Sequence, residues 1–156
     1  MAASLRTFEG GPPLQEEALR SFETKHGLAL PASYREFLLA TNGGRPERDL
    51  VAITGLESQS PGRIHLFFGL NDPVVSCNLD WNLEVFRDRI PAGLLPIATT
   101  EGADKLCLSI AGEHPGAIFY WDGYAPAGER NLYRLAEDFT AFLSSLHADE
   151  LSPRPG

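Results

Sequence analysis

Three short runs rich in leucine, β-branched and aromatic residues constrain the fold of this chain more than any other feature. The runs are LLPIATT (94–100), DKLCLSI (104–110) and GAIFYWD (116–122), and they are joined by the short connections TEGA and AGEHPG. Runs of this length with Gly-containing loops between them are typical of β-hairpins. The sequence therefore predicts that these three runs are consecutive strands of an antiparallel meander.

The segment LPASYREFLLATNGG (30–44) predicts a helix with well-marked ends. Pro31 fits the first helical turn, because the N–H that proline lacks would have no partner there. Asn42 and Gly43 tolerate the left-handed conformation that ends many helices. Three residues at helical spacing form the face that we expect to pack on the core: Tyr34, Phe37 and Leu38. Packing and capping explain this segment, so we assign it a structural role only.

Apolar residues recur at helical spacing in three further stretches, and two stretches alternate like strands. The helical stretches are residues 14–26 and 77–90 and a last helix that starts near Ala136, and the strand candidates are residues 49–54 and 63–70. The order of elements is then helix, helix, strands, helix, strands, helix. Because helices and strands do not alternate strictly, we predict an α+β fold, with an antiparallel sheet flanked by helices.

The chain length suits one domain. It has 156 residues, of which 43% are apolar, and neither an internal repeat nor a linker is visible. We predict a single domain over residues 13–148, preceded by an N-terminal extension (1–12) and followed by a C-terminal tail (149–156).

The charge of the chain disfavours two classes of partner. The formal net charge is -8, which repels nucleic acid and anionic lipid and favours basic partners. No apolar run approaches the length of about 20 residues that spans a bilayer, and the first residues do not read as a signal peptide. We therefore expect a cytoplasmic protein that binds neither nucleic acid nor membrane directly, and whose Cys77 and Cys107 are buried, reduced thiols.

The sequence contains no recognisable catalytic or metal-binding motif. None of the four histidines lies within four positions of another, no CxxC occurs, and the serine-hydrolase, Walker and dinucleotide-binding signatures are absent. Both cysteines have apolar neighbours, which raise a thiol pKa and disfavour a nucleophilic role. We expect no cofactor, no metal ion and no enzymatic activity.

Acidic and aromatic residues gather near two of the predicted strand ends. Glu101 and Asp104 flank a glycine in one predicted turn, and Asp122 follows Trp121 at the end of a strand. Two carboxylates in one cleft could perform acid–base chemistry, but acidic residues are also what turns select. A third interpretation is a binding surface for a positively charged partner, because tyrosine and tryptophan are frequent interface anchors.

Four blocks of the sequence, taken in order, resemble the SMI1/KNR4 family of the SUKH superfamily. LPASYREFLLATNGG is similar to the family's LP-x-x-Y-x-x-FL…NGG signature, and LLPIATTEGADKLCLSI is similar to its PIA segment with an acidic glycine turn. GAIFYWDGY is similar to its YWD-type strand, and EDFTAFLSSL to its last phenylalanine-bearing helix. The resemblance runs from about residue 13 to residue 146, and its specificity lies in the ordered set.

The resemblance implies a single-domain α+β fold without catalytic apparatus. Bacterial relatives are regarded largely as immunity proteins that bind and neutralise toxin domains, often nucleases or deaminases, whereas fungal members are scaffolds in cell-wall regulation. This chain lacks the long disordered arms of the fungal proteins, which favours an immunity protein that binds a basic toxin domain. The alternative is a regulatory or scaffold module for an endogenous protein. Expected exposure and charge select the candidate partner-binding residues Glu101, Asp104, Asp122 and Tyr124, with Trp121 as a possible anchor. Of these, Asp104, Trp121 and Asp122 occupy matching family positions.

Overall fold

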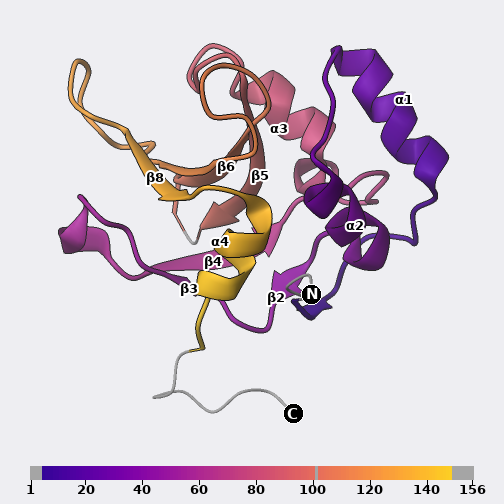
Figure 1. The fold of residues 1–156 in the computed structure, drawn as a ribbon, viewed down its shortest axis with the longest axis horizontal. Helices are drawn as coiled ribbons and strands as arrows, with labels where there is room; N and C mark the ends of the chain where they lie inside the picture. Colours follow the sequence, from indigo (N-terminus) through magenta and orange to yellow (C-terminus); the bar gives the residue numbers. More distant parts are fainter. Residues whose placement is uncertain (1–4, 101, 149–156) are drawn as a thin grey trace.

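A computed structural model of the chain describes residues 5–100 and 102–148 (Figure 1). The helices in these residues are α1 (Glu16–His26), α2 (Ala32–Thr41), α3 (Leu79–Val85) and α4 (Phe139–Ser145), with short 3-10 turns η1 (Glu57–Gln59) and η2 (Val75–Cys77). The strands are β1 (Thr7–Phe8), β2 (Arg45–Pro46), β3 (Leu50–Val51), β4 (Gly62–Phe67), β5 (Leu94–Thr100), β6 (Lys105–Ser109), β7 (Ile118–Trp121) and β8 (Leu132–Ala136).

The main sheet is an antiparallel meander. Six strands pair in the order β3-β4-β5-β6-β7-β8, so that strands adjacent in the sequence are adjacent in the sheet, while β1 and β2 form a separate pair. The three runs that most constrained the fold are β5, β6 and β7. The predicted fold class, α+β with an antiparallel sheet flanked by helices, is confirmed.

Two predicted helices have different limits in the structure. The prediction that the last helix starts near Ala136 is wrong, because Ala136 ends strand β8, which pairs with β7. Helix α4 begins at Phe139, where the carboxylate of Asp138 accepts a hydrogen bond from the backbone N–H of Ala141 at 2.7 Å. The third helix is also shorter than predicted, since α3 ends at Val85. The apolar period extends past both helices, because Phe86 and Ile90 pack after α3 has ended and Ala136 packs from strand β8.

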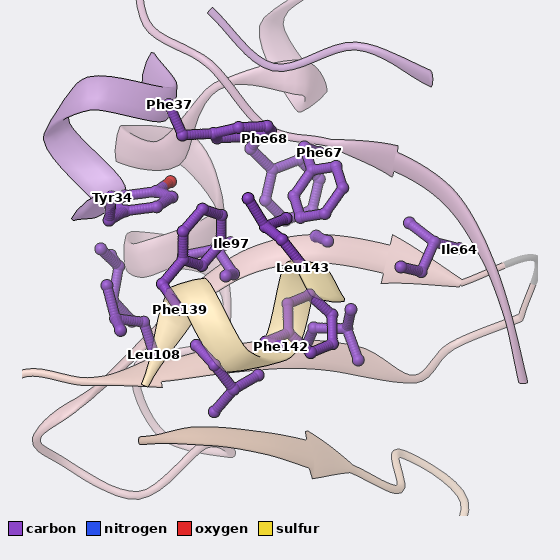
Figure 2. Close-up of a cluster of buried hydrophobic side chains, with 14 of the residues drawn as sticks. Tyr34, Phe37, Ile64, Phe67, Phe68, Ile97, Leu108, Phe139, Phe142 and Leu143 are labelled. Carbon is purple, nitrogen blue, oxygen red and sulfur yellow. The ribbon is translucent and has the colours of Figure 1, made fainter. Parts of the chain in front are cut away.

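The main hydrophobic core lies between the sheet and helices α2 and α4. Figure 2 shows Phe139, Phe142 and Leu143 of α4 directed toward the side chains of α2 and the central strands. Tyr34 of α2 meets Phe139 edge to face at a centroid distance of 5.1 Å, and Phe37 meets Phe67 of β4 at 5.0 Å. All five aromatic side chains are buried. The apolar faces predicted for α2 and for the last helix are therefore the faces that build this core.

A smaller apolar cluster covers the opposite face of the sheet. Side chains alternate along a strand, so Cys107 of β6 points away from its neighbours Leu106 and Leu108, which belong to the main core. Cys107 instead packs with Trp121 and Ile90, against the partly buried Phe86 that follows α3. Every residue of β6 is buried for this reason.

The glycine-rich end of α2 fixes the N-terminal part of the fold. Asn42 has a φ of 48° and Gly43 a φ of 82°, which confirms the predicted left-handed helix end. The buried Asn42 side chain also donates to the carbonyl oxygens of Pro12 (2.7 Å) and Leu70 (2.9 Å) and accepts from the N–H of Leu70 (2.8 Å). Three segments that are distant in the sequence are thereby joined by one amide.

Candidate functional site

The β5–β6 turn and the β7–β8 loop lie at the same end of the sheet. Strands β6 and β7 are antiparallel, and Lys105 pairs with Trp121 in their register. This pairing brings Asp104, the residue before β6, and Asp122, the residue after β7, to the same end of the sheet. The structure thus groups candidate residues that are separated by 18 positions in the sequence.

Asp104 connects the two loops. One carboxylate oxygen accepts a short hydrogen bond from the hydroxyl of Tyr120, and the other accepts from the N–H of Gly123 at 2.9 Å. Burial and the neighbouring Asp104 both raise the pKa of Tyr120, so its hydroxyl stays protonated and continues to donate. Asp104 is only 6% exposed, and both of its oxygens serve the fold.

Asp122 shapes the loop that follows β7. Its carboxylate accepts from the N–H of Tyr124 at 2.9 Å, and its own N–H donates to the carbonyl of Asn131 at 2.8 Å, which closes the base of the loop. A side chain that bonds to the backbone two residues ahead is a common device for holding a turn. The result is that Tyr124 projects from a turn with fixed ends and is 74% exposed.

Two basic residues and two aromatic rings support this loop pair. The guanidinium of Arg89 lies 5.0 Å from the centre of the Trp121 ring and donates to the carbonyl of Gly123 at 3.2 Å. The ammonium of Lys105 lies 4.8 Å from the Phe86 ring and donates to the carbonyl of Ala103 at 3.0 Å. Burial lowers the pKa of Lys105. Arg89 thus holds the β7–β8 loop and Lys105 holds the β5–β6 turn, and each cation is also attracted to an aromatic ring.

The structure gives the five predicted site residues different positions. Glu101 lies outside the described residues. Asp104, Trp121 and Asp122 are buried, so the premise that the two aspartates are exposed is wrong; hydrogen bonding to the loops explains their burial. Direct partner contact by these residues stays an untested prediction. Of the four candidates that the structure describes, only Tyr124 presents a large surface.

Sequence reasoning missed several residues of this site. Tyr120, Arg89, Lys105 and Phe86 form its supporting contacts. The alternation of β7 could have indicated that Tyr120 and Trp121 face opposite sides of the sheet. No sequence signal indicates Arg89, because it reaches the site from the irregular segment between α3 and β5.

The described residues contain no ready-made reactive or metal-binding cluster. No group of three or more histidine, cysteine, aspartate or glutamate side chains in residues 5–100 and 102–148 is placed to hold a metal ion. Cys107 is buried as predicted, but Cys77 is only half-buried, and desolvation raises the pKa of both thiols. Raised thiol pKa values leave little thiolate at neutral pH.

No helix in the described part of the chain is long and apolar enough to cross a membrane.

The protein is therefore a single α+β domain. Its six-stranded meander displays an exposed tyrosine on a loop that buried carboxylates hold. The chain belongs to the SMI1/KNR4 family (SUKH-1), whose sequence model matches residues 13–145. It is similar to the SPbeta prophage-derived uncharacterized protein YokK of Bacillus subtilis (strain 168). The two are 26% identical, and the match covers 83% of this chain and 73% of that protein. Domains of this family typically bind partner proteins and are generally not catalytic.

Proposed function

We propose that this chain is an immunity protein that binds a basic toxin domain of the nuclease or deaminase class and neutralises it without catalysis. The proposal places the chain in the cytoplasm, where a toxin of this class would meet its nucleic-acid or nucleotide substrate. Membership of the SMI1/KNR4 family supports a protein-binding role. The proposal adds that the bound partner is a toxin.

The observation that carries the proposal is the display of Tyr124. Tyrosine offers a large contact surface with few rotatable bonds, and it is enriched among residues that dominate interface energies. Its loop is already held by Asp104 and Asp122 before any partner arrives. A partner therefore meets a preorganised anchor, and less conformational entropy is lost on binding.

The charge of the chain supports a basic partner. A net charge of -8 on 156 residues attracts a positively charged domain over a distance and speeds the encounter. A toxin that acts on nucleic acid needs a basic surface for its substrate. An acidic binder that covers this surface would block the substrate directly.

The test is purification of the tagged full-length chain from its native host at low and at high salt, followed by mass spectrometry. We expect a basic protein that is retained at low salt and released at high salt. That protein should arrest growth when it is expressed alone, and co-expression of this chain should restore growth. Recovery of a harmless housekeeping protein instead would contradict the immunity role and favour the regulatory alternative.

Two variants locate the binding surface. Tyr124→Ala should weaken rescue, because it removes the exposed anchor. Phe8→Ala is the matched control, since Phe8 is an exposed aromatic residue on a different element, β1. If both variants rescue as well as the parent chain, the Tyr124 loop is not the interface.

A further inference from the structure

A second surface, formed by η2 and α3, exposes four large apolar side chains. They belong to Val74, Val75, Trp81 and Val85, and Val75 is the most exposed of them at 63%. Three other large apolar side chains in the described residues have comparable exposure, and these three lie on separate elements. A cluster of exposed apolar groups marks an interaction surface more often than scattered ones do. We refer to these four residues with Asp80 and Glu84 as the η2–α3 surface.

The surface is hollowed. A depression of about 530 Å³ is lined by Val75, Trp81 and Val85 together with Asp80 and Glu84. Lys25 of α1 closes one side, where its ammonium lies 3.3 Å from the carboxylate of Asp80. The lining of the depression thus combines three large apolar side chains with two carboxylates.

The exposed valines are held in place. The amide of Asn78 accepts from the N–H of Asp72 at 2.8 Å and donates to the carbonyl of Val75 at 3.2 Å. The backbone of Gly69 makes two further hydrogen bonds. Its N–H donates to the carbonyl of Cys77, and its carbonyl accepts from the N–H of Leu79, both at 2.9 Å. A turn with this many internal bonds does not need to order itself when a partner binds.

The charge around the depression selects the partner. The stretch of residues 72–88 carries four carboxylates and one arginine. Lys25 and His26 both contact Oδ1 of Asp80, and Arg87 lies 3.5 Å from Oε1 of Glu84. Oδ2 of Asp80 and Oε2 of Glu84 take part in none of these contacts. Glu84 is 58% exposed at its side chain. Apolar surface bordered by an excess of negative charge complements an apolar segment bordered by positive charge.

We propose that the η2–α3 surface binds a basic amphipathic segment of a protein partner. An aromatic or branched apolar side chain of that segment packs against Val75, Trp81 and Val85, and flanking lysine or arginine residues meet Asp80 and Glu84. This inference involves none of the residues predicted from the sequence and does not depend on toxin neutralisation.

Other occupants fit the same surface less well. A two-fold contact between copies would bring together two surfaces that carry the same excess of carboxylates. Anionic membranes and nucleic acids are repelled by these carboxylates and by the net charge of the chain.

The test uses a synthetic helical peptide with leucine and tryptophan on one face and lysine on the other. This peptide is titrated into the 15N-labelled full chain, and the two tryptophan indole N–H signals are followed by NMR. Trp81 is 37% exposed and Trp121 only 2%, so the two signals report different environments. We expect the Trp81 signal to shift and the Trp121 signal to stay in place, with assignment by Trp81→Phe.

Matched variants test the two parts of the proposal. Val75→Asp and Glu84→Lys should each weaken binding by about tenfold, as expected when an anchor contact or a facing charge is lost. Both side chains are exposed, so both variants should fold. Leu39→Asp is the control for the first change and Glu113→Lys for the second, because both lie on exposed positions of other elements.

Several results would overturn the proposal. They are no shift of the Trp81 signal with the lysine peptide, an equal shift with a peptide in which glutamate replaces lysine, and equal weakening by the control variants. Shifts of Trp81 with protein concentration alone would assign the surface to a second copy. Shifts with vesicles of anionic lipid would assign it to a membrane.

Discussion

Tyr120 donates its phenolic hydrogen to the carboxylate of Asp104, across the strand pair β6–β7. The same carboxylate accepts from the N–H of Gly123. One buried aspartate therefore links the end of the β5–β6 turn to the β7–β8 loop, which carries Tyr124. This link explains why an acidic residue in a turn is buried. Because of this link, the stability of the domain and the orientation of the loop that carries Tyr124 depend on the same hydrogen bonds.

Removing the hydroxyl of Tyr120 should therefore destabilise the domain. We expect Tyr120→Phe to lower the free energy of unfolding by about 1.5–3 kcal/mol, because a buried carboxylate loses a hydrogen bond. Urea unfolding followed by circular dichroism measures the change. The control is Tyr133→Phe, since the Tyr133 hydroxyl makes only a 3.4 Å contact with the carbonyl of Arg130, and it should change stability by less than about 0.5 kcal/mol. Equal effects of the two variants would contradict the role given to Asp104.

Removing the hydroxyl of Tyr34 should instead stabilise the domain. This atom is buried in the main core without a hydrogen-bond partner among the described residues. Because a buried polar group without a partner lowers stability, we expect Tyr34→Phe to raise the free energy of unfolding by about 1 kcal/mol. The same urea measurement applies, and a loss of stability would show that the hydroxyl is satisfied in solution.

A methyl group at Gly123 should disturb the loop. A Cβ there would lie 2.9 Å from the carbonyl oxygen of Ala103 and 3.1 Å from the Trp121 ring. We expect Gly123→Ala to cost about 1–3 kcal/mol through overpacking and to weaken any binding through Tyr124. Gly102→Ala is the control, because its Cβ would meet only Tyr124, at 3.9 Å. Thermal unfolding of both variants provides the comparison.

Stability should fall at alkaline pH. Burial raises the pKa of Tyr34, Tyr120 and Cys107 above their ordinary values of 10.0, 10.0 and 9.0. Above those values the unfolded chain has lost these protons while the folded chain keeps them, so the free energy of unfolding decreases as pH rises. Below about pH 9 this contribution is fully present.

Urea titrations at increasing pH test this trend. The unfolding midpoint should drop above about pH 9, and tyrosinate absorbance of the two buried tyrosines should appear only with unfolding. Lys105 acts in the opposite direction, because burial lowers its pKa and stability gains as its proton is lost. A midpoint that rises with pH would mean that Lys105 outweighs the three acidic groups.

Much of the fold could be predicted from local patterns. The short connections between β-rich runs predicted β5, β6 and β7, and helical spacing predicted the buried faces of α1, α2 and α4. Strand β8 was missed because most of its residues are half-buried, with only Tyr133 buried and Arg134 exposed, so that the strand shows no regular alternation. Its conformation is decided by pairing with β7. The boundary of the domain at residue 13 stays a prediction.

The candidate site was predicted only in part. Expected exposure and charge selected Glu101, Asp104, Asp122 and Tyr124 from the sequence, with Trp121 as a possible anchor, but did not place the two loops at one end of the sheet. The sequence could not indicate that three of them are buried, since Trp121 is covered by Phe86 and Arg89 from another part of the chain, and the two aspartates turn their carboxylates toward hydrogen-bond donors of the loops and of β7.

Residue spacing, turn residues and the left-handed preference of Asn and Gly act within a few positions, so local sequence was enough to predict the α+β class, the meander and the ends of α2. Which side chains are exposed depends on how the whole chain packs. Asp104 became a buried link, Tyr124 an exposed anchor, and Val75, Trp81 and Val85 an open apolar surface. The physical reason is that exposure and charge pairing arise between segments that are distant in the sequence and meet only when the chain packs.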